Sequence, residues 1–465
     1  MNHFQNILIG SSSLVFLAPS LYAQSAKRPN IVIINVDDFG WTDMSNNGSS
    51  YYETPNIDAL RRAGVWFGQG YAGAANSGPS RACMLTGMNT PRHGIYTVAS
   101  SERGKAKDRK LIPIKNHTVL KPGTQILTQV LHDNGYFTCH IGKWHVSKDP
   151  YKCGVDVNIG GNHAGHPKSY FSPYHNANLS DGPKGEYLPD RLGREAVNFI
   201  ANAPLDKPFF LYYATYSVHT PLQAPKDIIA KYKNKKCGTQ HNNPIYAAMI
   251  EGVDNNIGKV LQMLKERHLE ENTLIFFTGD NGGVYDISRQ WPLRAGKGSF
   301  YEGGIRVPFI IYQKGKFEHR EINNSCVSQM DFFPTIMNLL HIDTSKLVLD
   351  GKNLLPLLSN QVDKIDRSLY YHFPAYLENG NSETTDMKFR TRPVSVVRNG
   401  DWKLIENYEN HEYELYNLKD DLSENKNVKD LYPDVKNKLI DQLEQWKEKV
   451  HAPIPNKLNP KYEEK

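Results

Sequence analysis

The feature that most constrains the fold is an alternation of short apolar runs with amphipathic segments after residue 30. Residues 31–36 (Ile-Val-Ile-Ile-Asn-Val) form an almost continuous β-branched run, typical of a strand buried on both faces of a parallel sheet. Residues 247–264 place apolar side chains at helical spacing, as at Ile250, Val253 and Ile257. Further strands are expected at 136–141, 209–213, 274–277 and 307–312, and further helices at 56–64 and 125–134. The alternation predicts a layered α/β domain with a largely parallel sheet.

The C-terminal part of the chain has a different pattern. Short strand-like runs at 370–373, 393–398, 402–408 and 413–418 follow one another with little helix between them. Asn399-Gly400 favours a two-residue hairpin, and apolar residues spaced along 435–450 predict a terminal amphipathic helix. We therefore expect a larger domain at 27–366 and a smaller α+β domain with an antiparallel sheet at 367–465.

The beginning of the chain has the pattern of a secretory signal. Residues 7–17 are apolar apart from serines at 11–13, and small residues follow up to position 26. The stretch is too short to span a bilayer and predicts a signal peptide over 1–23, cleaved after Ala23. A buried N-terminal helix is the alternative. A signal peptide would place the protein in a periplasm or outside the cell, without a transmembrane segment.

Charge and cysteine content exclude several classes of protein. The formal net charge of +6 is spread over 465 residues without a basic block, which argues against nucleic acid as a partner. Five cysteines are an odd number and lack short metal-type spacing, so they indicate neither a disulfide framework nor a zinc site. In an exported protein some of them could still pair.

Two predicted strands end in acidic clusters. Asp37 and Asp38 follow the first strand, and Asp280 and Asn281 follow the strand at 274–277. Ligands of parallel α/β sheets bind beyond the carboxyl ends of the strands, so these side chains are candidates for one site. Three carboxylates and a carboxamide form a hard oxygen set that suits Ca²⁺ or Mg²⁺. The alternative is that both clusters are ordinary turns.

A third candidate element begins at Ser77 with the sequence Ser-Gly-Pro-Ser-Arg. It would place a nucleophile at the N-terminus of a helix, where backbone amides favour an anion. Arg81, one turn on, could hold a tetrahedral oxyanion with its forked guanidinium. The alternative is a Ser-Gly-Pro turn that leads into a helix capped by Ser80.

Residues 77–87 (Ser-Gly-Pro-Ser-Arg-Ala-Cys-Met-Leu-Thr-Gly) resemble the serine-type motif of the formylglycine-dependent sulfatases, in the alkaline-phosphatase-like superfamily. The resemblance extends over nearly the whole chain after the predicted signal. The matching motifs, in family order, include Asp-Asp at 37–38, Gly-Lys-Trp-His at 142–145, Val-His-Thr-Pro at 218–221, Asp-Asn at 280–281, Gly-Lys-Gly at 296–298, Tyr-Glu-Gly-Gly-Ile-Arg-Val-Pro at 301–308, Asp-Phe-Phe-Pro-Thr at 331–335 and Glu-Leu-Tyr-Asn-Leu at 414–418. The resemblance implies a large alkaline-phosphatase-like domain, with a mostly parallel sheet between helices, and a smaller C-terminal α+β domain.

The resemblance also implies a modified nucleophile. Ser77 would be oxidised to formylglycine (3-oxoalanine) by a serine-type, anaerobic maturation enzyme. One hydroxyl of its hydrate would attack the sulfur of a sulfate ester, and the second would allow sulfate to leave by elimination. One Ca²⁺ per chain would bind at Asp37, Asp38, Ser77, Asp280 and Asn281.

The resemblance assigns the remaining catalytic roles to charged residues and histidines. Lys143 and Lys297 would neutralise sulfate oxygens, and Arg81 would steady the formylglycine. His219 would be the general acid on the leaving oxygen, and His145 the base of the elimination. Because Lys143 and His145 are two residues apart, an extended backbone would direct both to the same face.

The expected substrate is a sulfated glycan, with O-sulfate on galactose or N-acetylgalactosamine. Residues 149–189, rich in Gly, His, Asn and Tyr and without periodicity, are expected to form a long loop. Loops of this length often contain functional residues.

Three alternative functions stay open. They are a phosphatase or phosphodiesterase with an unmodified serine and a second metal site, an inactive glycan-binding protein, and a sulfatase acting on small aryl or choline sulfates.

Overall fold

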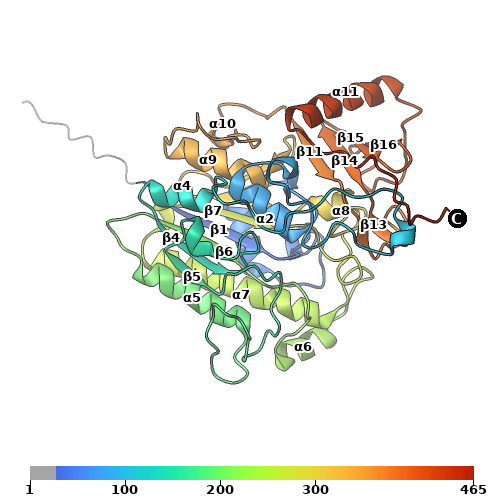
Figure 1. The fold of residues 1–465 in the computed structure, drawn as a ribbon. Coiled ribbons are helices and arrows are strands. Elements are labelled where there is room, and N and C mark those ends of the chain that lie inside the picture. The colour runs from blue at the N-terminus through green and yellow to red at the C-terminus, as the bar shows by residue number, and fades with distance from the viewer. Residues whose placement is uncertain (1–27, 465) are drawn as a thin grey trace, which may run out of the picture.

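The computed structural model describes residues 28–464 and is built around one large sheet. The predicted signal peptide at 1–23 lies outside the described residues. The sheet has the order β5-β4-β6-β1-β7-β8-β2-β9, and only β8 runs antiparallel to its neighbours (Figure 1). Its strands are β1 (Asn30–Val36), β2 (Val65–Phe67), β4 (Phe137–Gly142), β5 (Val157–Ile159), β6 (Phe209–Ala214), β7 (Thr273–Gly279), β8 (Phe309–Tyr312) and β9 (Arg320–Ile322).

The sheet is covered by helices on both faces because its central strands are apolar on both sides. All seven residues of β1 are buried. Val32 and Ile34 pack into the cluster formed with α5 (Leu188–Asn202) and α7 (Pro244–Glu266). Ile31 and Ile33 point the other way, into the cluster formed with α4 (Leu127–Asp133) and α9 (Phe332–Leu339). The predicted layered α/β fold is confirmed (Figure 1).

The remaining helices are α1 (Pro55–Ala63), α2 (Ser77–Thr86), α3 (Thr90–His93), α6 (Lys226–Lys233), α8 (Glu302–Ile305), α10 (Leu355–Leu358) and α11 (Pro433–Lys449). Among them, α1 and α2 also pack into the two clusters that cover the large sheet, and α11 covers the C-terminal sheet. The helices predicted at 56–64, 125–134, 247–264 and 435–450 are present as α1, α4, α7 and α11, with ends shifted by a few residues. Among the described residues, no helix is both long and apolar enough to cross a bilayer.

A second sheet is formed by the C-terminal part of the chain. Its order is β11-β14-β15-β16, antiparallel throughout, with α11 packed on one face (Figure 1). Its strands are β11 (Ser368–Phe373), β14 (Val394–Asn399), β15 (Trp402–Asn407) and β16 (Glu412–Asn417). The predicted hairpin is present, but one residue later than expected. Asn399 is still paired with Trp402, so the two-residue loop is Gly400 and Asp401, and Gly400 has a positive φ of 57°.

Two smaller pairs of strands and the cysteines depart from expectation. Tertiary contacts join β3 (Gly70–Tyr71) to β10 (Val327–Ser328), and β12 (Leu377–Glu378) to β13 (Phe389–Thr391). These strands are too short to leave a periodic pattern in the sequence.

All five cysteines are free thiols, so the disulfide pairing that export would permit is not formed in this structure.

A buried ionic cluster joins the two sheets. Lys403 on β15 is fully buried, and its Nζ lies 3.1 Å from Glu302 and 2.8 Å from Glu424. Glu302 also accepts a hydrogen bond of 2.8 Å from the hydroxyl of Tyr71 on β3. Burial opposes charge on Glu302, but Lys403 holds the pKa of that carboxyl below its ordinary value. Lys403 therefore bridges two buried carboxyl groups from different parts of the chain. Burial still raises the pKa of Glu424 to about 7, and Arg306 lies 3.6 Å from Glu302 as a second cation.

We expect Lys403→Met to lower the free energy of unfolding by about 3–5 kcal/mol, because it leaves the buried Glu424 without its cation and Glu302 with Arg306 alone. Urea denaturation followed by circular dichroism measures this loss. Lys364→Met is the control, since Lys364 forms an exposed ion pair with Asp366, and it should change stability far less. Equal losses in the two variants would contradict the proposed role of Lys403.

Candidate active site

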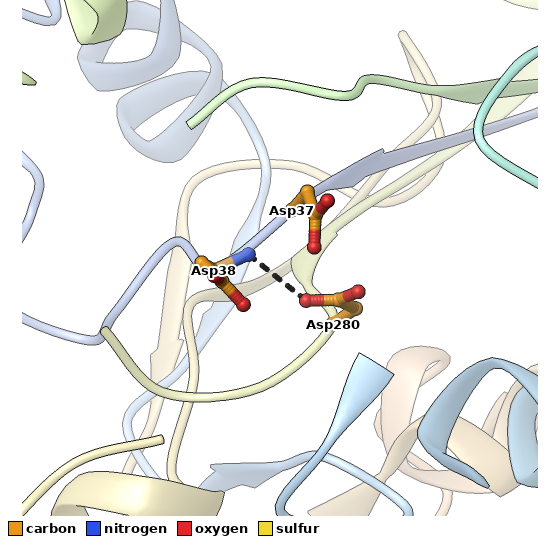
Figure 2. Close-up of side chains that lie close together, drawn as sticks. All are labelled: Asp37, Asp38 and Asp280. Carbon is orange, nitrogen blue, oxygen red and sulfur yellow. Dashed lines mark hydrogen bonds between the residues drawn. The ribbon is translucent and has the colours of Figure 1, made fainter. Parts of the chain in front are cut away.

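The acidic clusters meet because β1 and β7 are parallel neighbours in register. Val36 is paired with Gly279, so Asp37 and Asp38 emerge beside Asp280 at one edge of the sheet (Figure 2). The backbone N–H of Asp38 donates to Oδ1 of Asp280 at 3.0 Å. Ligand oxygens of the three carboxylates lie within 4.8 Å of one another, and all three residues are buried.

Burial and neighbouring charge set different pKa values for these carboxyls. Burial raises the pKa of Asp37 to about 7, although Lys143 acts against it. Burial also disfavours charge on Asp38, but Lys297, followed by His219, holds its pKa below the ordinary value. Arg81 has the same effect on the pKa of Asp280, again against burial. Neighbouring cations therefore keep Asp38 and Asp280 ionised, whereas burial favours the protonated form of Asp37.

Ser77 lies at the first turn of α2, directly beside this cluster. Its Oγ donates towards Oδ1 of Asp37 at 3.0 Å and Oδ1 of Asn281 at 3.1 Å. The helix begins at Ser77, so the alternative in which Ser80 caps the helix is wrong. The Oγ of Ser80 instead donates to Gln329 at 2.7 Å.

Arg81 is fully buried one turn further along α2. Its Nε donates to Oδ2 of Asp280 at 2.8 Å, and its Nη1 donates to the carbonyl of Lys143 at 2.8 Å. Its Nη2 has no hydrogen-bond acceptor among the described residues and lies 3.9 Å from Oδ1 of Asp37. The guanidinium therefore holds α2 against the strand ends and keeps one nitrogen free beside Asp37.

Two lysines reach the carboxylates from distant parts of the chain. Lys143 follows β4, and its Nζ donates to both carboxylate oxygens of Asp37, at 2.9 and 2.7 Å. Burial lowers the pKa of Lys143, and Asp37 opposes this shift. Lys297 lies in the loop before α8, and its Nζ donates to Asp38 at 2.7 Å. Each lysine thus pairs with one of two adjacent aspartates.

The two predicted histidines border the same site but differ in exposure. His145 is buried and adopts a left-handed backbone with φ of 65°, so the predicted extended backbone at 143–145 is wrong. Its Nδ1 has no hydrogen-bond partner within residues 28–464. The side chain of His219 is 18% exposed, and its Nε2 lies 3.8 Å from Asp38. Burial, reinforced by Lys297, lowers the pKa of His219 to about 3.

The structure thus brings together every residue that the sequence analysis assigned to the site. The sequence analysis did not predict that residues 162–166 contact His145 and His219. The carbonyl of Asn162 accepts from the N–H of His145 at 3.0 Å, and a Cβ on Gly165 would lie 2.8 Å from the His145 ring. The ring of His166 stacks on His219, with centroids 5.5 Å apart and planes at 8°. The glycine and histidine content of 149–189 was the only signal in the sequence.

The donor set fits a divalent cation of the calcium type. Three buried carboxylates, the carboxamide oxygen of Asn281 and the hydroxyl of Ser77 are all hard oxygen ligands. Ligand oxygens of Asp37, Asp38 and Asp280 converge in a buried space, and burial raises the pKa of Asp37 to about 7, so a cation bound there would stabilise the ionised carboxylate. No cysteine belongs to this cluster of described residues, which makes a zinc-type donor set a poorer match.

Known proteins share both the sequence pattern and the fold. The family model "Sulfatase" matches residues 29–342, and the model "N-sulphoglucosamine sulphohydrolase, C-terminal" matches residues 296–449. A sulfatase of Formosa agariphila is 30% identical over an alignment of 532 residues that covers 96% of this chain and 94% of the relative. Human N-acetylgalactosamine-6-sulfatase is 30% identical over 375 residues, covering 74% of this chain and 68% of the relative.

Solved structures agree with these matches. The crystal structure of Ps i-CgsB in complex with k-i-k-neocarrahexaose superposes with a TM-score of 0.75 at 28% identity, covering 92% of this chain and 95% of the other. A phosphonate monoester hydrolase of Agrobacterium radiobacter shares the fold with a TM-score of 0.67 at 20% identity, so the fold alone does not select the bond that is cleaved. The sulfatase model, however, matches more than half of the sequence, and this chain belongs to the sulfatase family of sulfuric ester hydrolases.

Proposed function

We propose that this protein hydrolyses an O-sulfate ester on a sugar of a sulfated glycan and releases inorganic sulfate. The observation that carries the proposal is the position of Ser77, whose Oγ lies within hydrogen-bond distance of Asp37 and Asn281. Lys143 and Lys297 border the same carboxylates. The names of two similar proteins, an N-acetylgalactosamine-6-sulfatase and an enzyme solved with a neocarrahexaose, support a sugar of the galactose type.

Calcium would be held by Asp37, Asp38, Asp280, Asn281 and the side chain at position 77. When bound, it supplies a Lewis acid that polarises oxygens of the nucleophile and of the sulfate group. Formylglycine at position 77, formed by a maturation enzyme, would supply a hydrated aldehyde, whose second hydroxyl allows sulfate to leave by elimination.

The cations of the chain bind and orient the sulfate group. Lys143 and Lys297 provide mobile ammonium groups that can turn from Asp37 and Asp38 to sulfate oxygens. Arg81 stays in place because its Nε is tied to Asp280, and its free Nη2 faces the side of Asp37 on which position 77 lies. Fixed and mobile cations together compensate the charge of the substrate in a buried site.

The two histidines hold protons at defined atoms. Nδ1 of His219 lies 2.8 Å from the carbonyl of Thr220, which can only accept, so this nitrogen carries a hydrogen and Nε2 faces the site. A proton taken up at Nε2 when the anionic sulfate group is bound would make His219 the general acid on the leaving oxygen. Nδ1 of His145 is buried without a partner among the described residues and would accept a proton from position 77 during release of sulfate.

We further propose that the protein is exported after cleavage of residues 1–23. The mature chain would then consist of a catalytic domain, residues 27–366, and a C-terminal subdomain, residues 367–465.

The second candidate activity is a phosphatase or phosphodiesterase with unmodified Ser77. The shared fold of the phosphonate monoester hydrolase favours it, but Lys143 and Lys297 stand beside the acidic cluster where a second metal ion would supply positive charge.

Ser77→Ala should lower turnover of 4-methylumbelliferyl sulfate at least about 1,000-fold, because it removes the nucleophile. Peptide mass across position 77 of wild-type protein made with a maturation enzyme should show the loss of two hydrogen atoms from serine. Ser50→Ala, which changes an exposed serine, should retain activity. Full turnover by protein that contains only unmodified serine would contradict the formylglycine mechanism.

Removal of calcium with EGTA should abolish turnover and lower the melting temperature, because the ligands form a site only in the folded chain. Calcium at about 100 times its Kd should stabilise the protein by about 2.7 kcal/mol. Asp280→Asn should weaken this response, whereas Asp363→Asn, an exposed position, should keep it. Metal analysis should find one calcium per chain, and two zinc ions would favour the phosphatase.

Gly165→Ala should lower kcat by about 10- to 100-fold, because the added methyl group displaces the His145 ring by contact at 2.8 Å. Turnover of the matured protein measures this effect, and thermal melting verifies that the variant is folded. Gly238→Ala is the matched control, since the Oγ of Ser50, at 3.9 Å, is the only described atom within 4 Å of its added methyl group. An unchanged kcat in Gly165→Ala would show that the segment does not position His145.

A further inference from the structure

The site opens to solvent at Lys297 and His219. The side chains of these residues are 13% and 18% exposed, whereas Ser77 is 2% exposed and Asp37 is fully buried. A saccharide that presents its sulfate to Ser77 therefore extends outward past Lys297 and His219. Side chains beside these two residues are in position to contact the rest of the saccharide.

The strand β13 packs directly against the Lys297 loop. Oγ1 of Thr391 donates to the carbonyl of Gly298 at 2.6 Å, and Nη1 of Arg390 donates to the carbonyl of Lys297 at 3.0 Å. A Cβ on Gly298 would lie 2.7 Å from Cδ of Arg390, so the backbone and the arginine are in close contact. The C-terminal part of the chain thus places a guanidinium next to the opening of the site.

Arg390 differs from the arginines near it. Arg103 forms a forked ion pair with Glu378, and Arg392 is paired with Asp386 and Glu409. Arg390 is partly buried, and within residues 28–464 its one hydrogen bond is to the Lys297 carbonyl and no carboxylate lies within ion-pair distance.

The acidic side chains nearest to Arg390 do not neutralise it. Asp38 and Glu378 are already paired with Lys297 and Arg103. Asp286 is exposed and lies beyond ion-pair distance. Burial lowers the pKa of Arg390, and Asp38 opposes the shift, but an arginine remains charged at any physiological pH. A partly buried cation without a carboxylate is costly unless a ligand supplies the anion.

We propose that Arg390 binds a second anionic group of the saccharide substrate, next to the sulfate that is hydrolysed. A sulfate ester or a uronate carboxylate has the planar or forked oxygen geometry that a guanidinium recognises with two hydrogen bonds. This inference rests on the proposed function and narrows its substrate class to saccharides with at least two negative groups.

Calorimetry on the calcium-loaded Ser77→Ala protein, which holds substrate without turnover, tests the inference. The probes are monosulfated galactose and N-acetylgalactosamine disaccharides, their disulfated counterparts, and a monosulfated disaccharide that contains a uronic acid. The second anionic group should tighten binding by about 10- to 100-fold. Adding Arg390→Met should reduce this advantage to below about threefold, and Arg390→Lys should leave an intermediate advantage.

Arg392→Met is the matched control, because its guanidinium is neutralised by Asp386 and Glu409, and it should keep the full advantage. An advantage confined to the disulfated probe assigns the partner as sulfate, and one confined to the uronic acid probe assigns it as carboxylate. An undiminished advantage in Arg390→Met, or no advantage before that change, overturns the inference. Failure of the matured wild type to hydrolyse any sulfated probe would instead overturn the proposed function.

Discussion

The parallel pairing of β1 with β7 is the constraint on which the site depends. It aligns Val36 with Gly279 and so brings two acidic turns from distant parts of the chain to one edge of the sheet. Three carboxylates in a buried space repel one another, so the surrounding fold must supply cations. Arg81, Lys143 and Lys297 meet this requirement from a helix, a strand end and a loop.

The charge balance explains how one site can hold both a cation and an anion. The three carboxylates are matched by three basic side chains, so the metal-free site is close to neutral. A divalent cation would make it positive and thereby attract a sulfate ester beside Lys143 and Lys297. Arg81, tied to Asp280, keeps the position of α2 and hence of Ser77 during these changes.

The C-terminal sheet contributes to the site as well as to stability. The buried contacts of Lys403 with Glu302 and Glu424 hold this sheet against the loop that carries Lys297. The same arrangement brings β13 to the opening of the site, where Arg390 contacts the Lys297 backbone. Contacts that stabilise the molecule therefore also determine which side chains lie at the opening of the site.

The sequence by itself determined the central strands, the main helices and the polar residues at the strand ends, because burial on both faces leaves a local apolar pattern. It also singled out Ser77, which the structure places beside the acidic cluster, because its motif is contiguous. The left-handed backbone of His145, the packing of Gly165, the hairpin loop at Gly400 and the placement of Arg390 beside Lys297 were decided only by the tertiary structure. The physical reason is that these features depend on contacts between distant segments or on how neighbouring strands pair, which no local periodicity records.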